Sequence, residues 1–70
     1  MWIITEDGNA ANLAQATDIM IFAGLKNNFE VKAIYPEMPT VLKSFDNKDD
    51  AKAYVAKVIR KLNIFSKGAN

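Results

Sequence analysis

Two pairs of adjacent carboxylates are the side chains best suited to acid–base chemistry. Glu6-Asp7 precedes Gly8, and Asp49-Asp50 precedes a segment with helical periodicity. Two carboxyl groups can serve as general acid and general base when their surroundings separate their pKa values. Each pair also has a simpler structural interpretation. The first belongs to a turn sequence, and the second supplies negative charge to the first turn of a helix. We therefore expect neither pair to be catalytic.

The chain offers few other groups for catalysis or for holding a cofactor. It contains no His and no Cys, which removes the commonest proton shuttle, a thiol nucleophile and thiolate metal ligands. Ser44 and Ser66 lie outside any G-x-S-x-G motif, and the three glycines are too isolated to form a phosphate-binding loop. The run that starts at Asp7 lacks the later ligands of a calcium loop. We expect no enzymatic activity, no metal or other cofactor, and no small-molecule ligand.

Basic side chains gather near the C-terminal end. The net charge is only +1, but residues 1–46 carry an excess of acidic side chains and residues 47–70 an excess of basic ones. Such asymmetry can indicate an anionic partner. The basic positions that could form a phosphate-contacting ridge on a helix are Lys52, Lys57, Arg60 and Lys61. Because outer helix faces are usually charged, we favour a solvated face and keep nucleic-acid binding as the alternative function.

Apolar side chains exceed what one helix packed on a sheet can cover, since half of the residues are hydrophobic. Trp and Met are enriched in the cores of protein interfaces. The candidate interface residues are Trp2, Met20, Phe22, Ile34, Met38 and Leu42. The leading hypothesis is a non-enzymatic module that binds a protein partner or forms a homodimer. The competing interpretation is a better-closed sheet, or a small barrel, that buries both faces.

A C-terminal helix over residues 47–63 is the element that would organise the rest. Asp46 or Asn47 can cap its start, and Asn63 can end it in a left-handed conformation. Acidic residues in the first turn and basic residues in the last agree with the helix dipole. The apolar positions follow a 3.6-residue period: Ala51, Tyr54, Val55, Val58, Ile59, Leu62 and Phe65. This stripe predicts an amphipathic helix packed on a sheet.

Short runs of β-branched and aromatic residues predict strands at 2–5, 19–23, 29–35 and 40–45. A turn at 6–9 and a loop at 24–28 separate them, and Pro36 and Pro39 mark residues 36–39 as a connection. Residues 10–16 are ambiguous between a short strand and a short helix, and we favour a strand at 10–13. The prediction is an α+β fold, with an antiparallel meander of four or five short strands and the helix across one face.

Seventy residues make one domain near the lower size limit for folding without metal or disulfide help, so a homodimer is a reasonable expectation. We expect one domain over residues 1–65 and a flexible tail over 66–70. The N-terminus lacks a basic region, and the longest apolar run, 19–25, is too short to span a bilayer. These features predict a soluble, cytoplasmic protein without a membrane partner.

The order of segments resembles that of a group of small uncharacterised bacterial and phage-associated proteins. The shared pattern is an opening strand, a turn with Gly, further strands, and a closing helix that begins with an acidic residue followed by Ala. The segments that carry it are MWIITEDGNAANL, Ile19-Met20-Ile21, Val31-Lys32-Ala33, Thr40-Val41-Leu42 and Asp50-Ala51-Lys52-Ala53-Tyr54. The resemblance implies a bacterial setting and this fold, and it assigns no site residues.

Overall fold

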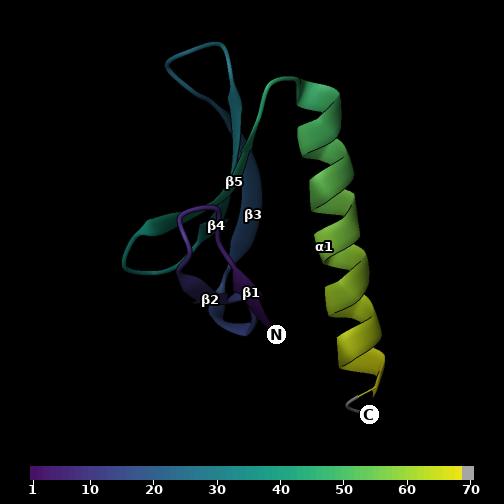
Figure 1. The fold of residues 1–70 in the computed structure, drawn as a ribbon. Helices are drawn as coiled ribbons and strands as arrows, with labels where there is room; N and C mark the ends of the chain where they lie inside the picture. The colour runs from purple at the N-terminus through teal and green to yellow at the C-terminus, as the bar shows by residue number, and fades with distance from the viewer. Residues whose placement is uncertain (69–70) are drawn as a thin grey trace.

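The computed structural model describes residues 1–68, which form five strands, a 3-10 turn and one α-helix (Figure 1). The elements in order are β1 (Trp2–Ile4), β2 (Ala10–Asn12), η1 (Leu13–Gln15), β3 (Asp18–Ala23), β4 (Phe29–Ile34), β5 (Pro39–Phe45) and α1 (Lys48–Gly68). The predicted α+β fold, with antiparallel strands and a C-terminal helix, is confirmed. The strands form two sheets instead of one continuous meander: the hairpin β1-β2, and a three-stranded sheet in the order β3-β4-β5.

The first hairpin is closed by a turn built around Thr5, which is buried. The Thr5 amide donates to the carbonyl oxygen of Asn9 at 2.7 Å, and the Asn9 amide donates to the Thr5 hydroxyl at 3.0 Å. Gly8 adopts a positive φ of 90°, which most other residues avoid. The ambiguous segment that follows contains both structures, because β2 ends at Asn12 and the Asn12 side chain then caps η1 by accepting from the Ala14 amide.

The first hairpin is bonded to the three-stranded sheet at a β-bulge in β5. The register of β4 with β5 shifts between Val31 and Lys32, so Leu42 has no direct partner on β4. The carbonyl oxygen of Leu42 accepts from the Glu6 amide at 2.9 Å, which ties the first hairpin to β5 by a single bond in place of a ladder. A second link comes from the Tyr35 hydroxyl, which donates to the Asn12 carbonyl at 3.1 Å.

Helix α1 starts at the predicted place and ends later than predicted. Asn47 caps it, because its side chain accepts from the Asp50 amide at 2.8 Å and donates to the Asp50 carboxylate at 2.9 Å. The helix passes Asn63 and reaches Gly68, since no strong helix breaker precedes that glycine. Residues 66–68 of the predicted tail belong to this helix, residues 69–70 lie outside the described part of the chain, and the flexibility of 66–70 stays a prediction. Within the described residues, no helix is both long and apolar enough to cross a membrane.

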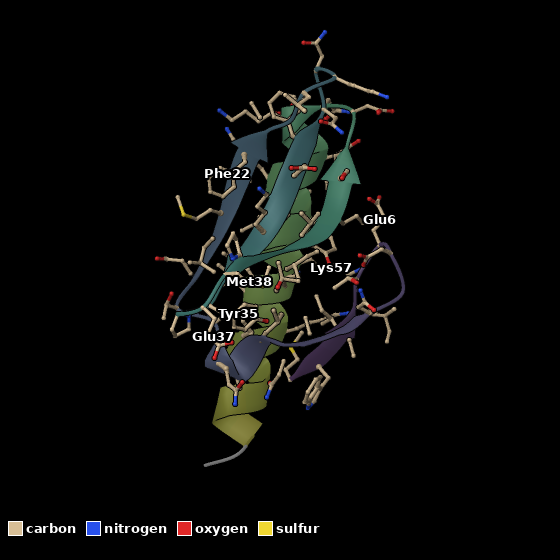
Figure 2. The ribbon with its side chains drawn as sticks, turned by 90° about the vertical axis from the view of Figure 1, so that its left-hand side faces the viewer. Glu6, Phe22, Tyr35, Glu37, Met38 and Lys57 are labelled. Carbon is tan, nitrogen blue, oxygen red and sulfur yellow. The ribbon has the colours of Figure 1, made fainter. Side chains whose placement is uncertain are left out.

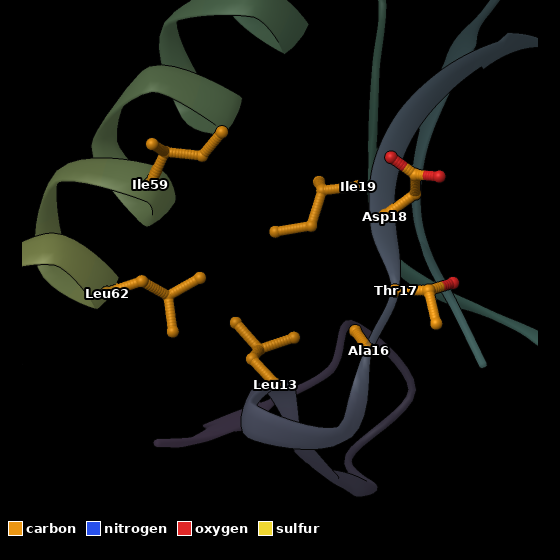
Figure 3. Close-up of a pocket in the computed structure, with 7 residues that line it drawn as sticks. All are labelled: Leu13, Ala16, Thr17, Asp18, Ile19, Ile59 and Leu62. Atoms are coloured by element: carbon orange, nitrogen blue, oxygen red, sulfur yellow. The ribbon is translucent and has the colours of Figure 1, made fainter. Parts of the chain in front are cut away.

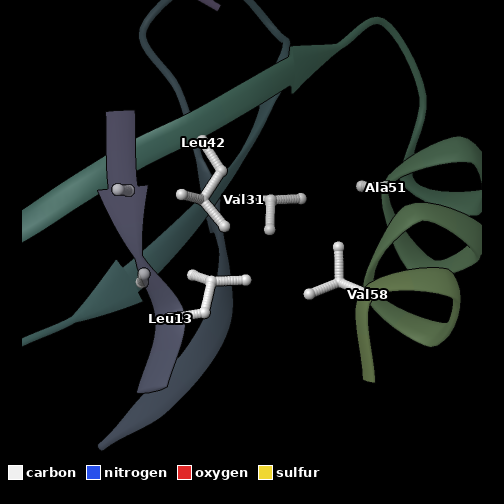
Figure 4. Packing of buried hydrophobic residues seen from close by; sticks show 7 residues of the cluster. Leu13, Val31, Leu42, Ala51 and Val58 are labelled. Atoms are coloured by element: carbon white, nitrogen blue, oxygen red, sulfur yellow. The ribbon is translucent and has the colours of Figure 1, made fainter. Parts of the chain in front are cut away.

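The core lies between α1, the inner face of the three-stranded sheet and the first hairpin (Figure 4). Its buried residues are Ala11, Leu13, Val31, Ala33, Leu42, Ala51 and Val58. Phe45 and Tyr54 close one side, with ring centroids 5.4 Å apart. Among residues 1–62, Leu42 and Val31 are the largest fully buried side chains, so this part of the core is thin.

Candidate functional site

The three-stranded sheet has one face covered by α1 and one face without cover (Figure 2). We call the uncovered side the outer face. Side chains alternate along a strand and paired residues share a face, so the register identifies its members. They are Asp18, Met20 and Phe22 on β3, Glu30, Lys32 and Ile34 on β4, and Pro39, Val41 and Ser44 on β5. Met20 is 46% exposed and Phe22 is 37% exposed, whereas Ile34 and Val41 are half-buried.

The centre of the outer face carries one charge of each sign among apolar neighbours. The Lys32 Nζ atom lies 3.8 Å from a carboxylate oxygen of Glu30 and 4.9 Å from the centre of the Phe22 ring. A cation over an aromatic face and next to a carboxylate is favourably placed, although such partly exposed contacts contribute little to stability. The face is therefore amphipathic and has no net charge from this pair.

The six predicted interface residues do not form one surface. Met20, Phe22 and Ile34 lie together on the outer face, and Met38 is exposed in the turn that connects β4 to β5 (Figure 2). Trp2 is 68% exposed but belongs to the other sheet. Leu42 is wrongly assigned to the interface, because it is 1% exposed in the core.

The bulge explains why Leu42 was wrongly predicted to be an interface residue. Simple alternation from Thr40 to Phe45 puts Leu42 and Phe45 on opposite faces, but the extra residue in β5 turns both toward the core. The same shift leaves Val41 opposite Lys32, on the outer face. Sequence reasoning missed Val41, and no residue in β5 signals a bulge by its type.

Strand β3 forms an open edge of this sheet. The Gly24 amide donates to the Asn28 carbonyl at 2.8 Å, which makes this a hydrogen-bonded pair. Antiparallel pairing alternates, so the amides and carbonyls of Ile19, Ile21 and Ala23 point away from β4. Apart from Asp18 at its first position, the strand contains no charged residue, no Pro and no bulge, the devices that usually protect an edge.

The opposite edge of the sheet is protected. Strand β5 begins with Pro39, contains the bulge at Leu42 and exposes Lys43. Its backbone also has partners outside the sheet, because the Leu42 carbonyl accepts from the Glu6 amide and the Ser44 amide donates to the Glu6 carboxylate at 3.4 Å. The contrast identifies β3 as the edge that can accept another strand.

An apolar groove opens beside the start of β3, between this strand, η1 and α1 (Figure 3). Its volume is about 320 Å³, and it is lined by Leu13, Ala16, Thr17, Asp18, Ile19, Ile59 and Leu62. Figure 3 shows Leu13, Ile19, Ile59 and Leu62 pointing toward the gap, whereas the polar ends of Thr17 and Asp18 point away from it. The groove can therefore accept an apolar side chain and offers little for a polar ligand.

The hairpin tip at the other end of β3 presents a fully exposed leucine, Leu25. The residues next to Leu25 determine the backbone conformation of the tip. Asn27 adopts a positive φ of 57°, and a Cβ atom at Gly24 would overlap the Asn28 side chain. An apolar side chain without any cover is unusual at such a position, because polar residues dominate turns. Leu25 is not among the described residues that form the core or pack against it.

The two carboxylate pairs have structural partners. The Thr5 hydroxyl donates to Asp7, and this bond is the main reason that the pKa of Asp7 lies below its usual value. Glu6 accepts from the Ser44 amide, and Asp50 contacts the cap residue Asn47. Within residues 1–68, no group of three acidic side chains is close enough to hold a metal ion.

The four basic residues predicted to contact phosphate, Lys52, Lys57, Arg60 and Lys61, are exposed on α1 but do not form one ridge. Lys57, Arg60 and Lys61 cluster with the spacing i, i+3, i+4, whereas Lys52 and Lys61 lie roughly 180° apart around the helix. Nucleic-acid binding therefore stays a prediction for the cluster alone. Salt-dependent retention of DNA or RNA that is abolished by Lys57→Glu with Arg60→Glu would support it.

No family model, curated protein or solved structure matches the chain. The resemblance to small bacterial and phage-associated proteins stays a prediction.

Proposed function

We propose that the protein is a non-enzymatic, cytoplasmic module that acts by self-association, and that the contact surface centres on β3. The observation that carries the proposal is that β3 combines exposed apolar side chains with an unpaired backbone edge. Met20 and Phe22 are exposed on its outer face, and within residues 1–68 its backbone edge has no strand partner and Asp18 as its single charged residue.

The thin core supports the same proposal. Among residues 1–62, three of the seven buried core residues are alanines, and the largest side chains with almost no exposure are Leu42 and Val31. Chains of this size bury a small share of their surface and commonly gain stability by association. Contact through β3 would cover apolar surface that the chain cannot cover by itself.

Sedimentation equilibrium over a range of protein concentrations tests the proposal. We expect the average mass to exceed 7.8 kDa and to rise with concentration. Met20→Glu should return the mass to that of the monomer, because it places a charge on the contact surface. Met38→Glu is the matched control, since Met38 is more exposed (66%) and lies off β3. A wild-type mass that stays monomeric at all concentrations would refute the proposal.

A further inference from the structure

An exposed apolar side chain and an apolar groove lie at opposite ends of the open β3 edge. Leu25 follows the end of β3, and Thr17, which lines the groove, precedes its start. The groove also lies on the inner side of the sheet, where Ile19 and Ile21 point. Leu25 lies in the turn after β3, so its side chain would reach the groove of a second copy where the pairing of the strands continues past Ala23 through Gly24.

We propose that β3 pairs antiparallel with β3 of a second copy of the chain, across a two-fold axis at Ile21. This inference rests on the proposed self-association and specifies its geometry. The two three-stranded sheets would join into one continuous sheet, with both helices on the same side. The outer faces of the two copies would then form a single surface.

The register follows from the backbone. Only the arrangement with Ile21 opposite the partner's Ile21 pairs every outward-facing residue of β3, because Ile19 then lies opposite the partner's Ala23. Each such pair exchanges two N–H···O bonds. On the outer face, Met20 lies opposite the partner's Phe22, an apolar cross-strand pair that is favourable in sheets.

The same register places Leu25 of each copy opposite Thr17 of the other, at the mouth of the groove. Leu25 of each copy would thus fill the groove of the other copy, and this contact would occur once at each end of the paired strands. This arrangement accounts for an exposed leucine that the isolated chain leaves unexplained.

The charges near β3 also favour a second copy over an unrelated strand. Asp18 is the one charged residue in β3, and it would face the partner's Gly24, two residues before the partner's Lys26. Antiparallel pairing therefore brings opposite charges together at both ends and places no like charges opposite each other. Both halves of the complementary surface are present in one chain, which is the requirement for a two-fold interface.

Disulfide trapping tests this geometry, and the absence of native cysteine makes the result unambiguous. A mixture of Thr17→Cys and Leu25→Cys chains should form a covalent dimer rapidly under mild oxidation, because the two residues face each other. Neither variant alone should do so. Two copies of Thr17 would lie eight residues apart along the pair, roughly 26 Å at about 3.3 Å per residue, too far for a disulfide.

The control is a mixture of Leu25→Cys with Met38→Cys, since Met38 is exposed but lies in the turn after β4. Covalent dimer from Thr17 with Leu25, and little from this control, would support edge pairing. If the wild type self-associates but the control mixture links as fast, edge pairing is refuted and the proposed function stands. A strictly monomeric wild type refutes both.

Ala23→Pro provides a second test through the backbone. The Ala23 amide points to the free edge, so proline removes an intermolecular donor without breaking the bonds to β4. We expect at least a tenfold weaker association, with an unchanged far-UV circular dichroism spectrum. Unchanged association of a folded Ala23→Pro chain would overturn the inference.

Discussion

Thr5 is the residue on which the first hairpin depends. Its buried hydroxyl accepts from the Asn9 amide and donates to Asp7, and its own amide donates to the Asn9 carbonyl. These bonds fix the turn that brings Glu6 to the carbonyl of Leu42. A single polar side chain thereby positions the contact between the two sheets.

Thr5→Val keeps the shape of this side chain and removes its hydrogen bonds. We expect a loss of about 1 to 3 kcal/mol in the free energy of unfolding, because the Asn9 amide loses its partner at the buried Thr5 side chain. Chemical denaturation measures the change. Thr40→Val, at a half-buried strand position, is the matched control and should cost much less. Equal losses for both variants would show that the hydroxyl of Thr5 has no special role.

The hydrogen bond from Thr5 also predicts a pH dependence. It lowers the pKa of Asp7 in the folded chain below its ordinary value of 3.8. The stabilisation is therefore present above the unfolded-state pKa and is lost as the pH falls through the folded-state pKa. Asp7→Asn should flatten the acid limb of a plot of stability against pH. An acid limb identical to that of the wild type would contradict this assignment.

Tyr35 forms a second link between the two sheets, besides the bond from Glu6 to Leu42. It follows β4, and its hydroxyl donates to the Asn12 carbonyl at the end of β2. Tyr35→Phe should lower the free energy of unfolding by about 1 kcal/mol, the usual net value of one such bond. Burial raises the pKa of Tyr35 above 10.0, so its contribution is complete below the unfolded-state pKa and is lost as the pH rises through the folded-state pKa.

Denaturation between pH 7 and pH 11 measures both effects in one series. The Tyr35→Phe variant should lose less stability at alkaline pH than the wild type. Tyr54→Phe is a useful comparison, because burial also raises the pKa of Tyr54 but no hydrogen bond ties its hydroxyl to the other sheet. If Tyr35→Phe and the wild type respond identically to alkaline pH, burial of the Tyr35 hydroxyl does not shift its pKa as assigned.

Local signals predicted most elements of the fold. The apolar period and the cap at Asn47 located the start of α1, alternation located β4, and the turn residues before Ala10 located the first hairpin. These features depend on residues close in the sequence. The later helix end was missed because Asn63 tolerates both a helix and a cap.

Long-range features of the fold and the site escaped sequence reasoning. The bulge at Leu42 depends on contact with Glu6, 36 positions earlier in the chain, and it decides that Leu42 is buried while Val41 is not. The groove depends on how α1, η1 and β3 meet, and the unused edge of β3 depends on the strand order. Met20 and Phe22 were correctly expected to share a face of β3, because strict alternation along one strand determines it.

At the scale of the whole molecule, the chain combines a thin core with one protected and one open sheet edge. A net charge of +1 gives little electrostatic repulsion between copies. An open, apolar edge in a nearly neutral domain favours pairing with another chain. The proposed self-association through β3 would satisfy the backbone edge, cover Leu25 and fill the groove in one arrangement.

Amide hydrogen exchange of β3, followed by NMR at low and high protein concentration, is the measurement that tests whether the β3 edge pairs with a second copy. The amides of Met20 and Phe22 bond to β4 and should be protected at both concentrations. Those of Ile19, Ile21 and Ala23 should exchange rapidly in dilute solution and become protected as the concentration rises. Rapid exchange of these three amides at every concentration would contradict pairing through the β3 edge.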